Sequence, residues 1–388
     1  MALNRQQISQ IYRPVGPKLI WPTVAWSSGG KQISPSGTVD LTWPARALRF
    51  VFKGRIVIGT AGFTTVYPHG FLELIQRVYV YGVNSIAGGQ ITLCDMPLSV
   101  LWDLAHMFSY RAFSGDIAGT VLPVPTMPYP ATSYNPIGST GTYDFRMTWE
   151  IPFHPFSAPE YSRPGFLVRG TEWKNTLTVW LEFGTQAGGG ATGCLGVSAA
   201  TTTITYSSYG SGSGSPTIDV YAVPAIMGLD LAPGVTPGVI SRVGQPINTP
   251  LQGAGTNVNL LTLQNRSTPR LYIQNGVLGS GVALASLSDT NITTLGVIVG
   301  ANKNVRNKVD VFAHKLDAIQ AYQRDPIQGS VVFDFMESQN SDSSYPADKL
   351  DASSAFQLVA DVVGVGSGYG VIVQEQQLFR PEGSLYTF

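Results

Sequence analysis

The chain has 388 residues, of which 44% are hydrophobic and only 12% are charged. This length suits two domains of ordinary size, and the charged fraction is roughly half that of a typical soluble protein, which indicates that other subunits cover much of the surface. The 24 basic and 24 acidic residues give a formal net charge of zero. Because proteins that neutralise phosphates usually carry a basic excess, this balance argues against direct binding of nucleic acid.

Two cysteines, Cys94 and Cys194, are too far apart in the sequence to form a metal-binding motif, and one pair is no disulfide framework. We expect two free, buried thiols, which fits a reducing compartment. Residues 1–21 lack the apolar core of a signal peptide, and no run of about 18 apolar residues occurs. We therefore expect neither export by the usual route nor a membrane span.

Residues 1–44 are predicted to form an N-terminal arm. Residues 4–11 are compatible with two helical turns before Pro14, and the rest is rich in Pro, Gly and Ser, with Trp21 and Trp26 among them. Such a segment packs poorly by itself, so we expect it to lie along a neighbouring surface. The alternative is a disordered leader, in which aromatic residues are scarcer.

The first half then takes on a β pattern. Apolar residues alternate with polar ones most regularly in the segment that begins at Tyr143, with Phe145, Met147, Trp149 and Ile151 on the face expected to be buried. Two long stretches rich in Gly, Ser, Pro or Thr, 114–142 and 184–215, are predicted loops. The predicted strands are 48–58, 71–81 (or a short turn followed by a strand), 143–151, 177–183 and 218–222.

One helix is predicted in the first half. Leu98, Leu101, Ala105 and Phe108 recur at helical spacing behind Pro97. Asp95 is the expected N-cap, because a carboxylate there accepts hydrogen bonds from the first free N–H groups.

The stretch 223–246 interleaves four prolines with four glycines. Proline cannot donate to a strand ladder and glycine weakens a strand, so we predict a crossing between two halves rather than a strand.

The second half repeats the order of the first. A helix is predicted at 308–324, ended by Pro326, with Val309, Phe312, Leu316 and Ile319 along one face. The predicted strands are 257–264, 270–274, 295–299, 330–336, 356–363 and 371–378.

Strands, a single helix and further strands thus occur twice. This order is typical of an all-β chain made of two tandem jelly rolls, each with one inserted helix and long loops. We predict three parts: an arm at 1–44, a first jelly roll at 45–229 and a second at 230–388.

The chain resembles the double jelly-roll major capsid proteins of tailless, internal-membrane bacteriophages, the tectivirus type. The resemblance rests on LELIQRVYVY at 72–81 and on four blocks of the second half: 308–324, 329–335, 356–362 and 370–377. It implies a homotrimeric, pseudo-hexagonal capsomer that tiles an icosahedral shell over a membrane. It also implies that residues 1–13 face that membrane and that the two long loops project outward.

Several motifs invite a chemical interpretation. The spelling G-x-G-x-x-G at 188–193 follows a strand, but the Thr-rich residues after it do not predict the helix that a dinucleotide site needs. Glu150 and Glu182, expected on neighbouring strands, would have the residue types of a glycosidase pair, yet both alternate with apolar residues on the predicted wet face. We interpret the glycine motif, Glu150 and Glu182 as structural features.

The histidines are scattered at His69, His106, His154 and His314, with no metal-ligand spacing. The sequons at Asn265 and Asn291 are interpreted as ordinary loop residues. Tyrosines in the predicted loops would suit sugar stacking or packing between subunits, and we favour packing; they are Tyr129, Tyr134, Tyr206 and Tyr209.

The sequence therefore predicts a structural protein of a virion, synthesised in the host cytoplasm, with no catalytic, cofactor-binding or metal-binding residues and no cofactor. Its expected partners are itself as a homotrimer, neighbouring capsomers, minor capsid or vertex proteins and, through the arm, an internal membrane. The alternatives are a carbohydrate- or receptor-binding β-sandwich, such as a spike or fibre protein, and a β-sandwich glycoside hydrolase.

Overall fold

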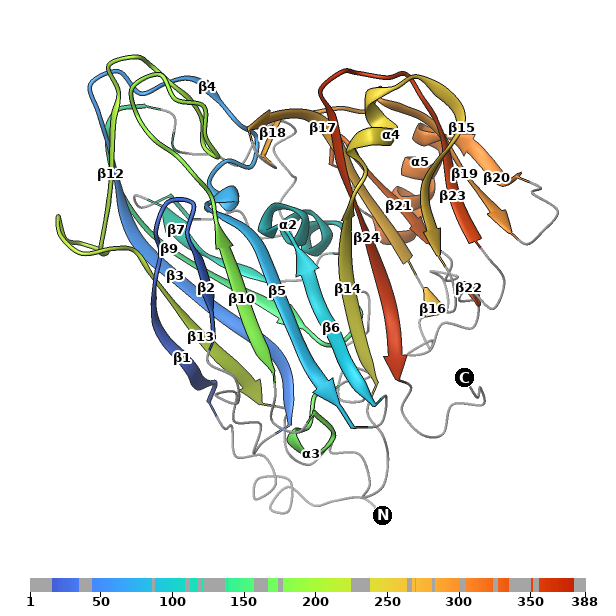
Figure 1. Cartoon of the computed structure of the whole chain (residues 1–388), viewed down its shortest axis with the longest axis horizontal. Coiled ribbons are helices and arrows are strands. Elements are labelled where there is room, and N and C mark those ends of the chain that lie inside the picture. Colours follow the sequence, from blue (N-terminus) through green and yellow to red (C-terminus); the bar gives the residue numbers. More distant parts are fainter. Residues whose placement is uncertain are drawn as a thin grey trace.

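The computed structural model describes most of the chain as strands arranged in two sandwiches that lie side by side (Figure 1). The described residues are 16–34, 44–85, 88–108, 112–117, 120–121, 137, 139–156, 167–173, 177–224, 238–263, 267–268, 270–280, 283–299, 305–323, 327–334, 350–351 and 356–379. Residues 1–15 and 35–43 of the predicted arm and the expected domain boundary at 229/230 lie outside these ranges.

The first sandwich has two main sheets. One contains, in spatial order, β1 (Lys18–Ala25), β13 (Thr217–Pro224), β3 (Ala45–Gly59), β9 (Gly141–Pro152), β7 (Phe113–Ile117) and β8 (Thr120–Val121), with β12 (Thr203–Ser207) also paired to β3. The other contains β2 (Lys31–Ile33), β10 (Thr178–Phe183), β5 (Ile75–Asn84) and β6 (Gly89–Met96). A small pair, β4 (Phe63–Val66) and β11 (Gly196–Ser198), lies at one end of this sandwich (Figure 1).

The second sandwich repeats this plan. One sheet contains β14 (Val239–Pro246), β24 (Gly368–Phe379), β17 (Arg270–Ser280) and β18 (Ala283–Leu287), with β21 (Ser330–Asp334) also paired to β17. The other contains β15 (Gly255–Leu263), β23 (Phe356–Val362), β19 (Ile292–Val299) and β20 (Val305–Asp310). The strands β16 (Ser267–Thr268) and β22 (Leu350–Asp351) form a separate pair.

The sheet orders of the two sandwiches correspond strand by strand. The order β1-β13-β3-β9 in the first matches β14-β24-β17-β21 in the second, and β2-β10-β5-β6 matches β15-β23-β19-β20. A helix follows the last strand in each case: α2 (Leu98–Met107) comes after β6, and α5 (Val311–Tyr322) comes after β20. The predicted duplication of an all-β jelly roll with one long helix in each half is confirmed.

Alternating side chains explain why the central strands pair as they do. In β3, apolar residues face inward at every second position, and Phe50 stacks on Trp149 of β9 with ring centroids 5.0 Å apart. The outward positions carry cross-strand ion pairs such as Arg55 with Asp144. One face is therefore packed and the other polar, which fixes the register of the pair.

The arm prediction is wrong for residues 16–34. β1 pairs with β13 and β2 pairs with β10, so this segment forms an edge strand of each sheet in its own sandwich. Trp26 is buried between the sheets, and its indole nitrogen donates to the Leu74 carbonyl. The short strand lengths and two register shifts in β1 hide the period-two pattern.

The crossing prediction is wrong for its second part, because Val239–Pro246 is strand β14. This strand pairs with β24 on one side and, in parallel, with β6 of the first sandwich on the other. Its proline, Pro246, lies opposite Val371 at the end of the strand, and the next residue still donates to the Gly370 carbonyl of β24. A Cβ at Gly244 would lie 3.0 Å from the Asp95 carbonyl oxygen, so glycine permits the close approach of β6.

The predicted helices also differ in detail. α2 begins after Pro97, and Asp95 is not its cap but a residue of β6 that pairs with Arg77. α5 begins only at Val311, because residues up to Asp310 extend β20. The predicted loops contain β7, β8, β11 and β12. Shorter helical segments occur at η1 (Leu72–Leu74), α3 (Gly170–Trp173) and α4 (Asn248–Gln252).

Two apolar clusters fill the molecule. One lies inside the second sandwich. The other fills the first sandwich and continues onto the second, where it includes Tyr272, Tyr369 and Val373. The sandwiches are thus packed against each other through a continuous apolar layer. Within the described part of the chain, no helix is long and apolar enough to cross a membrane.

Candidate functional site at the junction of the two sandwiches

Buried charges hold the two sandwiches together where β14 meets β6. Arg242 of β14 donates through Nε to Glu375 of β24 at 2.9 Å, and both side chains are fully buried. Its two other nitrogens donate, each at 2.7 Å, to the carbonyls of Pro152 and His154, which belong to the first sandwich. A buried ion pair is stable only when further hydrogen bonds satisfy its charge, and here those bonds cross between the sandwiches.

The guanidinium groups of this network also lie on aromatic rings. Arg242 stands 4.1 Å from the centroid of Phe156, and Arg270 stands 4.9 Å from that of Phe108 at the end of α2. Arg270 also approaches Glu375, with Nη1 3.5 Å from Oε2. Weakly hydrated guanidinium groups suit such desolvated sites better than ammonium groups do. The network therefore joins β14, β17 and β24 to the first sandwich.

A second buried polar cluster lies around α2. Asp103 of α2 approaches Nε2 of His69 at 3.2 Å and accepts a hydrogen bond from Gln274 of β17 in the second sandwich. Ser99 of α2 donates to Glu73. Burial raises the pKa of Glu73 to about 7. For His69, burial lowers the pKa, but Asp103 and Glu73 together outweigh it and leave the pKa raised.

This cluster contains the residue types of an acid–base or nucleophilic site, and Ser99 donates to the Glu73 carboxyl group, which could act as a base. Its burial, however, separates it from solvent. All five side chains are at most 5% exposed, so none of them is open to a substrate in this structure. Among the described residues, no three His, Cys, Asp or Glu side chains are placed to hold a metal ion. The cluster acts as a polar contact between the sandwiches.

A groove of about 430 Å³ lies over the same junction on the outer face of the sheet. Its charged residues already engage one another: Arg77 donates to Asp95 at 2.5 Å and lies 3.8 Å from Glu182. Tyr369 and Pro246 of the second sandwich complete one side. Because the charges are mutually neutralised, the groove offers a ligand no unsatisfied ionic group.

The two glutamates considered for glycoside hydrolysis do not lie on neighbouring strands, so that expectation is wrong. Glu150 is on β9, whose partners are β3 and β7, whereas Glu182 is on β10 in the other sheet. Glu150 pairs with Arg49, and Glu182 pairs with Lys31. Both are members of cross-strand ion pairs on outer faces, as their alternation with apolar residues indicated.

The glycine motif at 188–193 is a loop that leads into β11, not into a helix. Backbone hydrogen bonds hold it, from Gly189 to Thr202 and from Gly190 to Ala199. A pyrophosphate site of the dinucleotide type is built on a helix N-terminus, whereas this loop leads into a strand.

The two cysteines are free and buried, as predicted. Burial raises the pKa of Cys94 to about 12 and also raises the pKa of Cys194, so neither is a reactive thiolate at neutral pH. The histidines are all buried, and His314 on α5 contacts the Leu295 carbonyl at 3.2 Å.

The predictions for the four tyrosines have different outcomes. Tyr206 packs on Trp26 of its own chain at 4.4 Å, so its expected packing between subunits is wrong. Tyr209 is exposed, and Arg146 lies 5.0 Å from its ring. Tyr129, Tyr134 and Asn265 lie outside the described residues. Asn291 is buried and bonded to Gly276 and Ser288, which leaves no room for a glycan.

Sequence reasoning missed an exposed apolar surface on the second sandwich. Phe312 and Leu316 of α5 are 62% and 53% exposed, and Val309 of β20 is also exposed. The helix instead buries Val311, Ala318, His314 and Lys315. The predicted apolar face is therefore present, but most of it faces outward. An apolar face on the outside of a folded chain indicates a surface that another molecule covers.

No family model and no curated protein sequence matches the chain. Among solved structures, it is similar to the major capsid protein of Sulfolobus turreted icosahedral virus, with 14% identity and a TM-score of 0.55 over 93% of this chain and 95% of that one. It is also similar to a PBCV-1 virus capsid structure, with 12% identity and a TM-score of 0.57 over 95% of each chain.

These similarities show the fold. The chain has the double jelly-roll fold of viral major capsid proteins, and the resemblance inferred from the sequence is confirmed at that level.

Proposed function

We propose that this chain is a major capsid subunit that works by assembly rather than by catalysis. The observation that carries the proposal is the similarity of fold to viral capsid proteins over nearly the whole chain. The junction supports it, because a shared sheet and two buried polar clusters make the two sandwiches one block. Such a block suits a repeating tile.

In this proposal three copies form a pseudo-hexagonal capsomer that tiles an icosahedral shell. Closed threefold symmetry turns two sandwiches per chain into a ring of six. An obligate interface of some thousands of Å² would supply the stability, at roughly 25 cal/mol per Å² of apolar surface buried. The boundary at 229/230 would separate the two sandwiches within each chain.

The proposal extends to the surroundings of the shell. The virus would be a tailless, internal-membrane bacteriophage, and the chain would be made in the host cytoplasm and reside in the virion. Residues 1–13 would face the membrane, and minor capsid or vertex proteins would be further partners. Segments 114–142 and 184–215 would project outward; β11 and β12 of the second segment lie along one side and end of the first sandwich (Figure 1).

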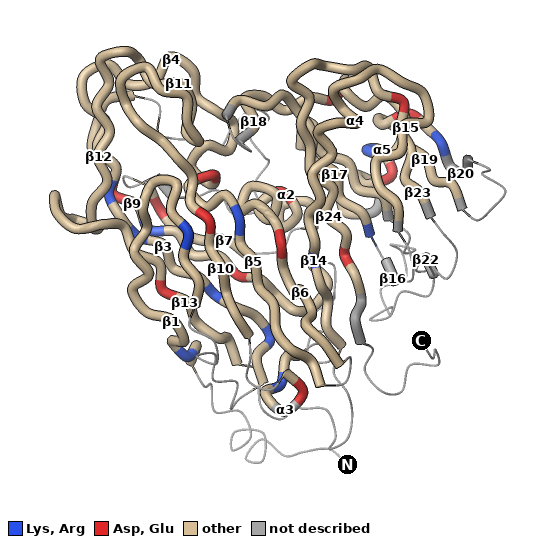
Figure 2. Tube along the Cα trace, in the orientation of Figure 1, with Lys and Arg blue, Asp and Glu red and all other residues tan. Residues whose placement is uncertain are grey.

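Charge supports a role without direct contact to the genome. Figure 2 shows Lys and Arg interspersed with Asp and Glu along the described strands, and many of these form ion pairs, such as Lys53 with Asp219 and Lys308 with Asp361. A nucleic-acid surface would gather positive charge on one face.

Light scattering on the purified chain tests the proposal. Three copies of 41.5 kDa predict a particle of about 125 kDa. A stable monomer at micromolar concentration would contradict it. Glycan binding by the isolated protein would favour a receptor-binding sandwich instead, and turnover lost on changing Glu150 or Glu182 would favour a hydrolase.

A further inference from the structure

The internal repeat shows how one sandwich covers the helix of another. In the first sandwich all ten residues of α2 are buried. The second sandwich supplies part of that cover: Gln274 of β17 donates to Asp103 of α2, and Tyr322 packs edge-on against Phe108 at 4.7 Å. Beside the helix, β14 pairs in parallel with β6. The sheet β14-β24-β17 is thus the surface that receives α2 and β6, and Figure 1 shows α2 at the middle of the molecule.

The second sandwich has the same helix, α5, but the described residues contain no third sandwich to cover it. When the two helices are aligned at their first residues, Ser99 and Asp103 of α2 correspond to Phe312 and Leu316 of α5. Asp103 is the residue that contacts the next sandwich in α2. At the corresponding positions α5 carries two large apolar side chains that are mostly exposed. In the described residues β20, the counterpart of β6, pairs only with β19.

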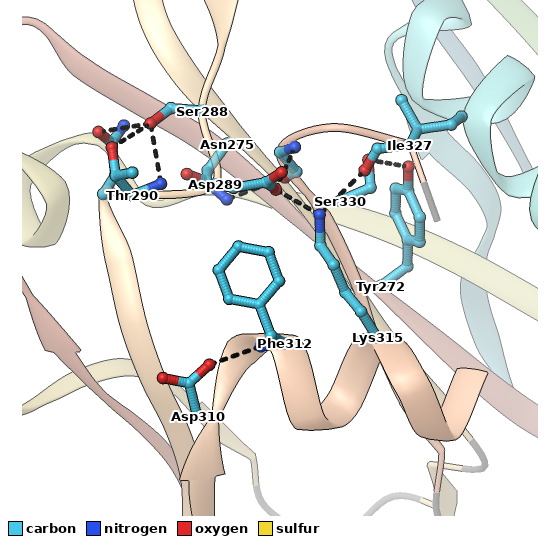
Figure 3. Close-up of polar contacts among 12 residues, drawn as sticks. Tyr272, Asn275, Ser288, Asp289, Thr290, Asp310, Phe312, Lys315, Ile327 and Ser330 are labelled. Carbon is cyan, nitrogen blue, oxygen red and sulfur yellow. Dashed lines mark hydrogen bonds and ion pairs between the residues drawn. The ribbon is translucent and has the colours of Figure 1, made fainter. Parts of the chain in front are cut away.

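Polar contacts fix α5 in this outward orientation. Asp310 caps the helix by accepting from the Phe312 N–H at 2.8 Å. Lys315 is buried and pairs with Asp289, whose carboxylate also accepts from the Gly329 N–H at 2.7 Å. Figure 3 shows Phe312 and Lys315 rising from the same stretch of the helix, with the ring 5.9 Å from the ammonium group. These contacts therefore fix the helix orientation in which Phe312 and Leu316 are exposed.

The first sandwich presents a matching surface on its own equivalent sheet. By the strand correspondence, β1-β13-β3 is the counterpart of β14-β24-β17. Leu19 of β1 is 45% exposed, and Tyr221 of β13 and Val51 of β3 are half-buried on the outer face, where they lie among cross-strand ion pairs such as Lys53 with Asp219. In the described part of the chain β1 is an edge strand of its sheet. Its counterpart β14 would also be an edge strand if β6 did not pair with it.

We propose that α5 and β20 of one copy bind the β1-β13-β3 face of a second copy of this chain. The contact between copies would repeat the contact that α2 and β6 make with β14-β24-β17 inside the chain. Such a contact is head-to-tail, and repeating it closes a ring when the rotation allows. This inference rests on the proposed trimer and names the surfaces that form its seam.

The double variant Phe312→Glu, Leu316→Glu tests the seam. Both side chains are mostly exposed within a single chain, so the variant should fold, and the melting temperature of the single chain should not change. Two charges buried in an apolar contact between copies should disfavour association. We expect light scattering to give about 41.5 kDa at concentrations where the unmodified chain gives about 125 kDa. Leu19→Glu, on the opposite surface, should have the same effect.

The matched control is Val363→Glu, which changes an equally exposed apolar residue after β23, away from α5. We expect this variant to keep the trimer mass. A trimer that survives both the α5 variant and Leu19→Glu would overturn the seam and leave the proposed trimer standing. A monomeric unmodified chain would instead overturn the proposed trimer itself, so the two failures are distinguishable.

Discussion

At the scale of single residues, Glu73 makes the stability of the fold depend on pH. Burial raises its pKa from 4.5 to about 7, so between these values the folded state holds a proton that the unfolded state has released. The free energy of unfolding should therefore fall as pH rises from about 5 to 8. His69 acts in the same direction, because its raised pKa gives stability at low pH that is lost as pH rises.

The variant Glu73→Gln should remove most of this dependence. We expect it to match the unmodified chain near pH 5 and to be more stable at pH 8, by at most roughly 3 kcal/mol, since one pKa unit corresponds to about 1.4 kcal/mol. Melting temperature across this pH range measures the effect. Asp317→Asn, an exposed carboxyl on α5, is the control and should keep the original slope. If melting temperature falls with pH as steeply in Glu73→Gln as in the unmodified chain, Glu73 is not the source of the pH dependence.

At the residue scale, the sequence predicted well those features that depend only on the spacing of residue types along the chain. The two separate cysteines are free and buried, as predicted, and the scattered histidines are buried as well. Sequence reasoning could not find Arg242, Glu375 or the Asp103 cluster, because each side chain lies on a different strand or helix and nothing in their spacing indicates a contact. In addition, Gly244 and Pro246 led to the prediction that the segment containing Arg242 is a crossing, whereas it is a strand.

At the scale of elements, the Arg242 network holds β14 and β24 against the end of β9. Replacing Arg242 with Met leaves Glu375 buried with only Arg270 nearby, at 3.5 Å. Removal of one partner from a buried pair typically costs about 3–5 kcal/mol, and we expect the lower end of that range because Arg270 compensates in part. Unfolding by denaturant measures the loss.

The matched control for this change is Lys31→Met. Lys31 also pairs with a glutamate, Glu182, at 2.9 Å, but its side chain is 61% exposed. Exposed ion pairs contribute about 0–1 kcal/mol, so this variant should unfold nearly as the unmodified chain does. Equal losses in the two variants would show that the Arg242 network does not hold the sandwiches together.

Element predictions from sequence depended on the regularity of the pattern. β9 and β23 alternate without interruption and were found close to their observed ends. β1 and β2 are short or bulged and were assigned to an arm. The apolar face of α5 was located from its spacing, but its direction was not predicted, because periodicity gives a face and does not say whether the chain itself or another molecule covers it.

At the scale of the whole molecule, the duplicated plan explains the unusual composition. In this account each sandwich needs a neighbour on the side of its helix, and the described part of the chain supplies that neighbour for α2 but not for α5. A low charged fraction follows if the remaining surfaces are also covered in an assembly. Strand order and helix position made the repeat predictable from sequence; the parallel pairing of β14 with β6 was not, because it is a contact between the two sandwiches.

The most direct test of this account is electron cryo-microscopy of the purified, unmodified particle. We predict a threefold particle with six sandwiches in a ring, in which α5 and β20 of each copy contact β1-β13-β3 of the next. A particle in which the sandwiches of different copies do not meet in a ring, or a population of single chains, would contradict the proposal that this protein is a capsid tile.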